Sequence, residues 1–139
     1  MGTMNREQLD KIISDHFMYE ATDDIEGVLR TFTDAAEHEL IGGPDGPLRG
    51  RAALRRFYER LFPDLRGERV EPVMRLYGDD FVIDETIWIG HVVDGRPFKL
   101  DGRSGKARLR LLHVFKLRDG LITKENVWFD FDELKRQLG

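Results

Sequence analysis

Apolar and polar residues alternate along the second half of the chain, a pattern typical of half-buried β-strands. The turn at residues 118–120 joins two alternating stretches, 107–117 and 121–129. The same pattern predicts strands at 69–77 and 81–92, and a short strand at 36–41. One face of 107–117 consists of Ala107, Leu109, Leu111, His113, Phe115 and Leu117. These strands are expected to form a mostly antiparallel sheet.

Apolar residues recur at helical spacing in the first half of the chain. This spacing predicts helices over residues 6–21 and 51–62, with Pro63 ending the second of them. Thr22 or Asp23 is expected to cap a short helix between these two, and its inward residues would be Ile25, Val28, Leu29 and Phe32.

The remaining segments are expected to connect these elements. Residues 42–50 and 94–106 are predicted to be loops, the second one mobile, because glycine, proline and charged residues dominate both. Asp130 or Asp132 is expected to cap a last helix that ends at Leu138. Helices followed by consecutive strands predict an α+β fold in one domain spanning residues 1–139.

Composition narrows the possible partners. The chain has 139 residues, a net charge of -4 and no cysteine, so it lacks the basic footprint of a nucleic-acid-binding protein and any thiolate chemistry. The sequence has neither an apolar signal segment nor a run long enough to cross a bilayer. We therefore expect a cytoplasmic protein that binds neither nucleic acid nor membrane.

Three of the four histidines lie on faces expected to point into the core. His16 belongs to the apolar stripe of the first helix, and His38 shares a strand face with Leu40. His113 lies among leucines, and Glu125 occupies a similar face of the next strand. Each could be a hydrogen-bonded core residue, because a buried polar group is costly without a partner. Three such residues in a small domain favour a pocket with polar groups in its wall.

A carboxylate beside an imidazole fixes its tautomer and raises its pKa, which suits general acid–base catalysis. Glu125 is a candidate for that role. Three histidines also suggest a zinc site, but no pair has the helical His-x3-His spacing. The preferred interpretation has no metal and no other cofactor.

The stretch 81–91 gives conflicting signals. One face holds Phe81, Ile83, Glu85, Ile87 and Ile89, and the other holds Val82, Asp84, Thr86, Trp88 and Gly90. Hydropathy alone predicts that the isoleucine face is buried. Both faces would be covered if helices packed on one and a partner subunit packed on the other.

Three segments resemble the nuclear transport factor 2-like superfamily, especially its SnoaL-like and ketosteroid-isomerase-like branch. They are "VLRTFTDAAEHELIGGPDGPLRGRAALRRFYERL", "GDDFVIDETIWIG" and "LLHVFKLRDGLITKENVWFDFDELKRQLG". The resemblance implies a cone-shaped roll, in which a strongly curved sheet wraps around N-terminal helices and encloses a deep pocket. It also implies homodimers that pack through the outer sheet face. Asp84, Thr86 and Trp88 would then face the pocket, and Ile83, Ile87 and Ile89 the partner.

The resemblance also gives roles to the histidines. His16 matches the oxyanion-hole tyrosine of ketosteroid isomerases, and His113 matches the protonated aspartate beside it. SnoaL-like cyclases also carry a histidine at the position of His113. His38 matches a water-positioning tyrosine of limonene epoxide hydrolases.

Several positions depart from these families. Leu40 stands where the isomerases carry their general base, and Val127 where cyclases and epoxide hydrolases carry an aspartate. Thr86 and Trp88 replace the arginine and aspartate of the epoxide hydrolases. None of the three known mechanisms is therefore expected in this chain.

Two hypotheses follow. In the first, an enzyme performs cofactor-independent acid–base chemistry on a small apolar, oxygen-bearing molecule, by isomerisation, dehydration, cyclisation or hydrolysis. His38 or Glu125 would accept a proton, His113 and His16 would stabilise an oxyanion, and Asp84 would orient a histidine or act as an alternative base. The pocket would be lined by Tyr19, Leu40, Tyr58, Thr86, Trp88, Leu111, Val127 and Phe129. In the second, the missing acids at Leu40 and Val127 indicate a binding module or scaffold.

Overall fold

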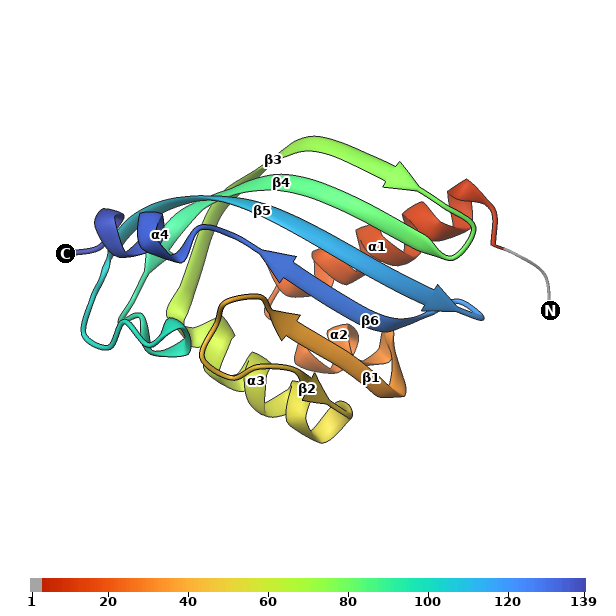
Figure 1. The fold of residues 1–139 in the computed structure, drawn as a ribbon, viewed down its shortest axis with the longest axis horizontal. Helices are drawn as coiled ribbons and strands as arrows, with labels where there is room; N and C mark the ends of the chain where they lie inside the picture. Colours follow the sequence, from red (N-terminus) through yellow and green to blue (C-terminus); the bar gives the residue numbers. More distant parts are fainter. Residues whose placement is uncertain (1–3) are drawn as a thin grey trace.

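A six-stranded sheet arches over three helices in the computed structural model, which describes residues 4–139 (Figure 1). The helices are α1 (Arg6–Ala21), α2 (Ile25–Arg30), α3 (Arg51–Asp64) and α4 (Phe131–Gln137), with a short 3-10 helix at Arg96–Phe98. The strands are β1 (Phe32–Leu40), β2 (Leu48–Arg49), β3 (Leu65–Tyr77), β4 (Phe81–Val92), β5 (Gly105–Arg118) and β6 (Leu121–Trp128). The predicted α+β class is confirmed.

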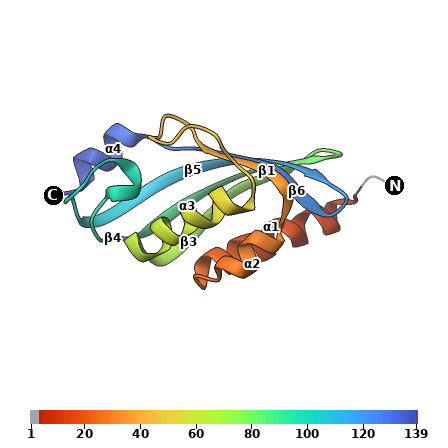
Figure 2. The ribbon, with the colours of Figure 1, turned by 90° about the horizontal axis from the view of Figure 1, so that it is seen from below.

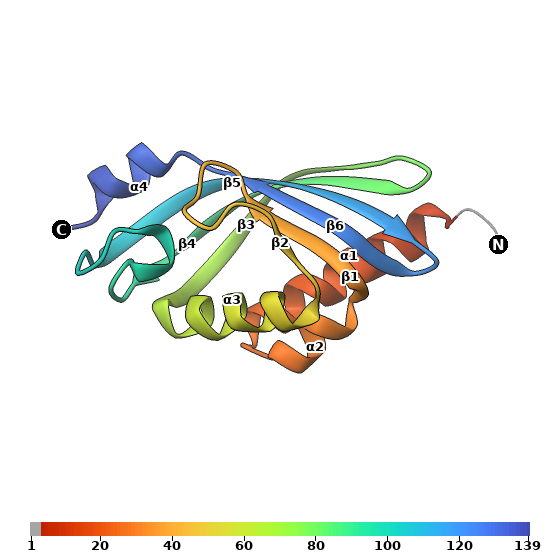
Figure 3. The same ribbon diagram turned by 60° about the horizontal axis from the view of Figure 1, so that its bottom comes forward.

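The strand order is β2-β1-β6-β5-β4-β3, and the sheet is not closed. Every pair is antiparallel except β1 and β6, which run parallel. Figure 2 shows α1, α2 and α3 on one side of the sheet, and Figure 3 shows α3 beneath β1 and β2. The inner face of the sheet therefore looks toward these helices.

The core lies between the helices and this inner face. Asn5 begins α1 with a capping box, in which its side chain accepts from the Gln8 backbone N–H and Gln8 bonds back to Asn5. The helix then buries Leu9, Ile13 and His16. These residues pack with Val28, Phe32, Leu54, Phe57, Tyr58, Phe115 and Ile122. A second apolar cluster at the α4 end contains Val92, Phe98, Leu109 and Leu134.

Several predicted boundaries were wrong. The second helix stops at Arg30, and Phe32 begins β1, four residues earlier than expected. Leu48–Arg49 forms an edge strand inside the predicted loop. Pro63 lies within the last turn of α3, which continues to Asp64. The strand β3 begins at Leu65 instead of residue 69, because residues 66–70 are exposed on both faces and show no alternation.

The connection 94–106 is attached to the end of α3, and its mobility stays a prediction. The buried Asp64 carboxylate accepts hydrogen bonds from the backbone N–H groups of Asp94 and Gly95, at 2.8 and 2.9 Å. Phe98 fills part of the second core cluster. A side-chain anchor of this kind, thirty residues away in sequence, has no signature in local composition.

The two faces of β4 are arranged opposite to the hydropathy prediction. Val82, Asp84 and Thr86 are buried on the inner face, whereas Ile83 and Ile87 are only partly covered on the outer face. The resemblance predicted this orientation. Ile89 was expected to face a partner with them, but it is buried within the chain at 4% exposure. Among residues 4–139, no helix is both long and apolar enough to cross a membrane.

Candidate functional site

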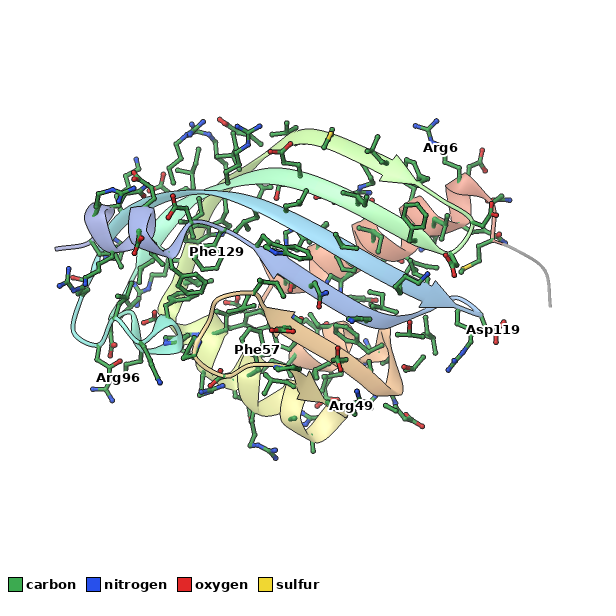
Figure 4. The ribbon with its side chains drawn as sticks, viewed as in Figure 1. Arg6, Arg49, Phe57, Arg96, Asp119 and Phe129 are labelled. Carbon is green, nitrogen blue, oxygen red and sulfur yellow. The ribbon has the colours of Figure 1, made fainter. Side chains whose placement is uncertain are left out.

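A cavity of about 1420 Å³ lies between the inner face of the sheet, α1 and α3. Its lining is mostly apolar, and it includes six of the predicted pocket residues, Leu40, Thr86, Trp88, Leu111, Val127 and Phe129. Phe57 and Phe129, both labelled in Figure 4, contribute aromatic surface from α3 and from the end of β6. Polar residues also reach the cavity, among them His38, His113, Asp84, Glu125 and Glu20.

Strand register explains why residues distant in sequence meet here. Leu40, Val127, His113, Asp84 and Arg75 are successive register partners across β1, β6, β5, β4 and β3. Two residues before Leu40 and Val127 on the same strands, His38 lies opposite Glu125 in the parallel β1–β6 pair. Because alternate residues of a strand share a face, both rows point toward the cavity.

Glu125 is the centre of the polar group. Its Oε1 atom lies 3.1 Å from His16 Nε2 and 3.8 Å from His38 Nε2, and its side chain is 1% exposed. His16 Nε2 also lies 3.5 Å from Glu20 Oε2. We refer to His16, Glu20, His38 and Glu125 as the Glu125 cluster.

The tautomer of His16 is set by Thr31. The Thr31 hydroxyl donates its single proton to the Val28 carbonyl at 2.6 Å. The same oxygen lies 2.9 Å from His16 Nδ1 and can only accept a hydrogen bond there. His16 Nδ1 therefore carries a proton and donates it to Thr31. His16 Nε2 consequently faces the carboxylates of Glu125 and Glu20.

Charge attraction determines the protonation of this cluster. Burial by itself raises the pKa of Glu125, but the charges of His16 and His38 outweigh burial and lower it to about 2. Burial lowers the pKa of His16, yet the charges of Glu125 and Glu20 exceed this effect and raise it. His16 and Glu125 therefore form an imidazolium–carboxylate pair.

Glu20 behaves differently. Burial, with help from the charge of Glu125, raises its pKa to about 7 against the opposing charge of His16. Its side chain keeps 25% of its surface exposed, so solvent moderates this upward shift. Glu20 is thus the member of the cluster that connects it with water.

His38 and His113 are the imidazoles in the cavity wall. Burial lowers the pKa of both rings, so they are neutral near pH 7. His38 packs against Phe57 with ring centroids 4.6 Å apart, and His113 lies parallel to Phe115. Within residues 4–139, the Nδ1 atoms of both rings are buried without a hydrogen-bond partner. Buried polar atoms without a partner are uncommon in proteins.

Asp84 is held by an arginine. Arg75 Nε donates to Asp84 Oδ2 at 2.7 Å, and the same guanidinium donates to Asp10 at 2.8 Å and to Ser14 at 3.0 Å. This ion pair is only partly exposed to solvent. Arg75 therefore fixes the position of the Asp84 carboxylate next to His113, its register partner.

Three predicted site residues lie elsewhere. His16 is fully buried behind the cavity wall, between Phe17, Phe32 and Phe115, and does not reach the cavity. Tyr19 packs its ring over Gly27, where any Cβ would come within 2.2 Å of the ring. Tyr58 belongs to the core, and burial with the charges of Glu125 and Glu20 raises its pKa well above 10. These tyrosines support the site from outside the lining.

Sequence reasoning missed Glu20, Thr31 and Arg75. Glu20 had a usable signal, because it follows His16 by four residues and so shares its helix face. Thr31 and Arg75 had none, since their partners come from other elements.

The comparisons with known proteins agree with this fold. A family model described as a SnoaL-like domain matches residues 13–125. The chain belongs to the SnoaL-like domain family. No curated protein is a significant match to the sequence.

Solved structures share the architecture at low sequence identity. A candidate polyketide cyclase from Xanthomonas campestris pv. campestris matches with a TM-score of 0.83 and 21% identity, over 96% of this chain and 98% of that one. A candidate isomerase from Bacillus subtilis matches at 0.80 and 19%, over 96% and 95% of the two chains. An M. tuberculosis LEH-like epoxide hydrolase matches at 0.73 and 15%, over 94% and 88%. These identities indicate a shared fold.

Proposed function

We propose that this SnoaL-like protein is an enzyme that performs acid–base chemistry without a cofactor on a small, largely apolar molecule bearing an oxygen function. The observation that carries the proposal is the position of Glu125. This buried carboxylate lies between two imidazoles in the wall of a mainly apolar cavity. Isomerisation, dehydration, cyclisation and hydrolysis are the reaction types that such a site serves, and the names of the structural neighbours fall in the same range.

His38 is the proposed general base. Glu125 is committed to His16 at 3.1 Å, whereas His38 lines the cavity as a neutral ring. A proton taken by His38 would be stabilised by the Glu125 charge, 3.8 Å from its Nε2 atom. Glu125 therefore acts as the charge partner of the base, and His16 keeps Glu125 in place.

His113 is the proposed oxyanion partner. It lies in the same cavity wall, and Asp84 and Arg75 continue its register row. A hydrogen bond from its ring to a developing negative charge would supply the electrostatic stabilisation that such reactions need. Leu40 and Val127 line the same wall without a carboxylate, so the mechanism differs from those of the isomerases and epoxide hydrolases.

The test is a turnover screen of small ketones, lactones and epoxides, followed by NMR in deuterated buffer. Substituting His38→Ala is expected to slow proton exchange or turnover by about 10²- to 10⁴-fold. The matched control is His91→Ala, which removes an exposed histidine and should leave turnover unchanged. Full turnover in both His38→Ala and His113→Ala would refute the proposal.

A binding protein is the second candidate, favoured by the apolar side chains at Leu40 and Val127. This candidate predicts saturable binding of an apolar ligand, detected by a shift of the melting temperature, with no chemical change in the ligand. Covalent conversion of any bound compound would exclude it.

A further inference from the structure

Three electron-pair donors of the Glu125 cluster, from His16, Glu20 and Glu125, lie together at the cavity wall. His16 Nε2 lies 3.1 Å from Glu125 Oε1 and 3.5 Å from Glu20 Oε2, and His38 Nε2 lies 3.8 Å from Glu125 Oε1. Ligand atoms of His16, Glu20 and Glu125 all lie within 4.8 Å of one another. The cluster thus combines the imidazole and carboxylate donors that zinc accepts.

The spacing fits a tetrahedral ion. Bonds of about 2.0–2.1 Å to a tetrahedral zinc ion place neighbouring ligand atoms about 3.3 Å apart. The two separations from His16 Nε2, 3.1 Å to Glu125 Oε1 and 3.5 Å to Glu20 Oε2, lie around this value. Small side-chain rotations would therefore bring the donors to bonding distance.

The buried donors are paired with each other by charge. His16 Nε2 and Glu125 Oε1 lie 3.1 Å apart as an ion pair. In the part of the chain from residue 4 onward, neither atom has a hydrogen-bond partner. Both side chains are at most 1% exposed. Buried polar atoms without partners are uncommon and indicate a missing ligand.

Thr31 prepares His16 for metal binding. It accepts the Nδ1 proton at 2.9 Å, so the lone pair of a neutral His16 is on Nε2, toward the two carboxylates. Metal-binding histidines commonly have such a partner on the second nitrogen, which fixes the ring and its tautomer.

We propose that the Glu125 cluster binds one zinc ion through His16, Glu20 and Glu125. The two carboxylates balance the charge of the ion. The inference goes beyond the proposed function, because it needs only these donors and no substrate. Zinc and protons compete for the same atoms, so binding releases protons. An ion that occupies Glu125 removes the charge partner of His38 and so inhibits the metal-free chemistry.

The experiment is calorimetric titration of chelator-stripped protein with zinc chloride, with the metal content measured after dialysis. One ion per chain is expected, and imidazole NMR signals of His16 and His38 should shift while those of His91 do not. Losing an outer-shell partner costs about 10- to 100-fold in affinity, so Glu20→Gln and Glu125→Gln should each weaken binding by at least that factor.

Two variants keep the test clear. Glu20→Gln preserves side-chain shape at a position that is 25% exposed, so it should fold normally, as circular dichroism can verify. His91→Ala controls for zinc held by an exposed histidine and should bind as the wild type does. The proposal fails if wild-type protein does not bind at 100-fold excess zinc, or if both glutamine variants bind unchanged.

Activity measurements separate this inference from the proposed function. Turnover by stripped protein that zinc inhibits would support both. Turnover that appears only after zinc is added would overturn the metal-free chemistry and support the zinc site. If the stripped protein turns over substrate and added zinc does not change the rate, the zinc site proposed here is overturned. A bound ion would occupy Glu125 and would have to change the rate.

Discussion

Thr31 is the residue on which the orientation of His16 depends. Its hydroxyl accepts from His16 Nδ1 and donates to the Val28 carbonyl, and all three groups are buried. Thr31→Val keeps the shape but leaves the ring N–H unpaired, which should lower the free energy of unfolding by about 1–3 kcal/mol. The measurement is urea denaturation in the presence of a chelator.

The control for this change is Thr123→Val. Thr123 donates to the Lys116 carbonyl at 3.2 Å near the surface, where water can replace the bond. Equal losses of stability in the two valine variants would show that Thr31 has no special role.

His113 should make stability depend on pH. Burial lowers the pKa of His113 in the folded state, and the charge of His16 lowers it further. The charges of Glu125 and Asp84 raise this pKa, but by less. Between the unfolded pKa of about 6.5 and the lower folded value, the unfolded chain binds more protons, so stability falls as pH falls. His113→Phe should show a shallower loss of unfolding free energy between pH 6.5 and 5.

The pH dependence of His113→Phe must be compared with that of the wild-type protein, because Glu20 changes the unfolding free energy with pH in the opposite direction. Its pKa is raised to about 7, so the folded state takes up its proton first and gains stability on acidification. This contribution is present in both proteins. An unchanged slope in His113→Phe would contradict the buried, neutral assignment of His113.

At the scale of elements, regular alternation and helical spacing were sufficient to predict the bounds of an element that has one buried face. The bounds of α1 and β4 were predicted as they are in the structure. The start of β1 and all of β2 were not predicted, because their pairing is with distant residues and their local sequence is polar. Position in the sheet, rather than residue preference, decides those segments.

Asp64 connects α3 to the segment that follows β4. Asp64→Ala would leave the N–H groups of Asp94 and Gly95 without acceptors, so faster amide hydrogen exchange is expected at residues 94–104. Mass-spectrometric exchange of that peptide measures the effect. Asp101→Ala, an exposed change in the same segment, should have none. Equal exchange in Asp64→Ala and wild-type protein would contradict the anchor.

At the scale of the molecule, the outer sheet face is the proposed dimer surface. Met74, Leu76 and Trp128 are exposed there, beside the partly covered Ile83 and Val114. Ile89, which belongs to the isoleucine face considered from sequence, is buried within the chain and is not part of this patch. An apolar patch on this scale indicates a protein partner, and we expect a second copy of the chain.

Light scattering tests the dimer. Wild-type protein at micromolar concentration should have twice the mass of one chain, and Leu76→Glu should shift it toward the monomer because a charge would be buried in the interface. Val93→Glu introduces the same charge at an exposed apolar position after β4 and should not. Monomeric wild-type protein would contradict this surface.

The site was predictable in part. The face patterns singled out His16, His38, His113 and Glu125 as inward polar residues, and the structure brings three of them together. The His38–Glu125 pairing arises from the parallel register of β1 and β6, which no spacing in the sequence reveals. For the same reason sequence could not show that Glu125 pairs with His16 instead of His113.

The most direct test is NMR titration of the imidazole rings in chelator-stripped protein. The account predicts that His16 titrates above the ordinary value of about 6.5, and that His38 and His113 titrate below it. Glu125→Gln should remove the upward shift of His16. Three rings that all titrate near 6.5, unaffected by Glu125→Gln, would contradict a shared buried cluster around Glu125.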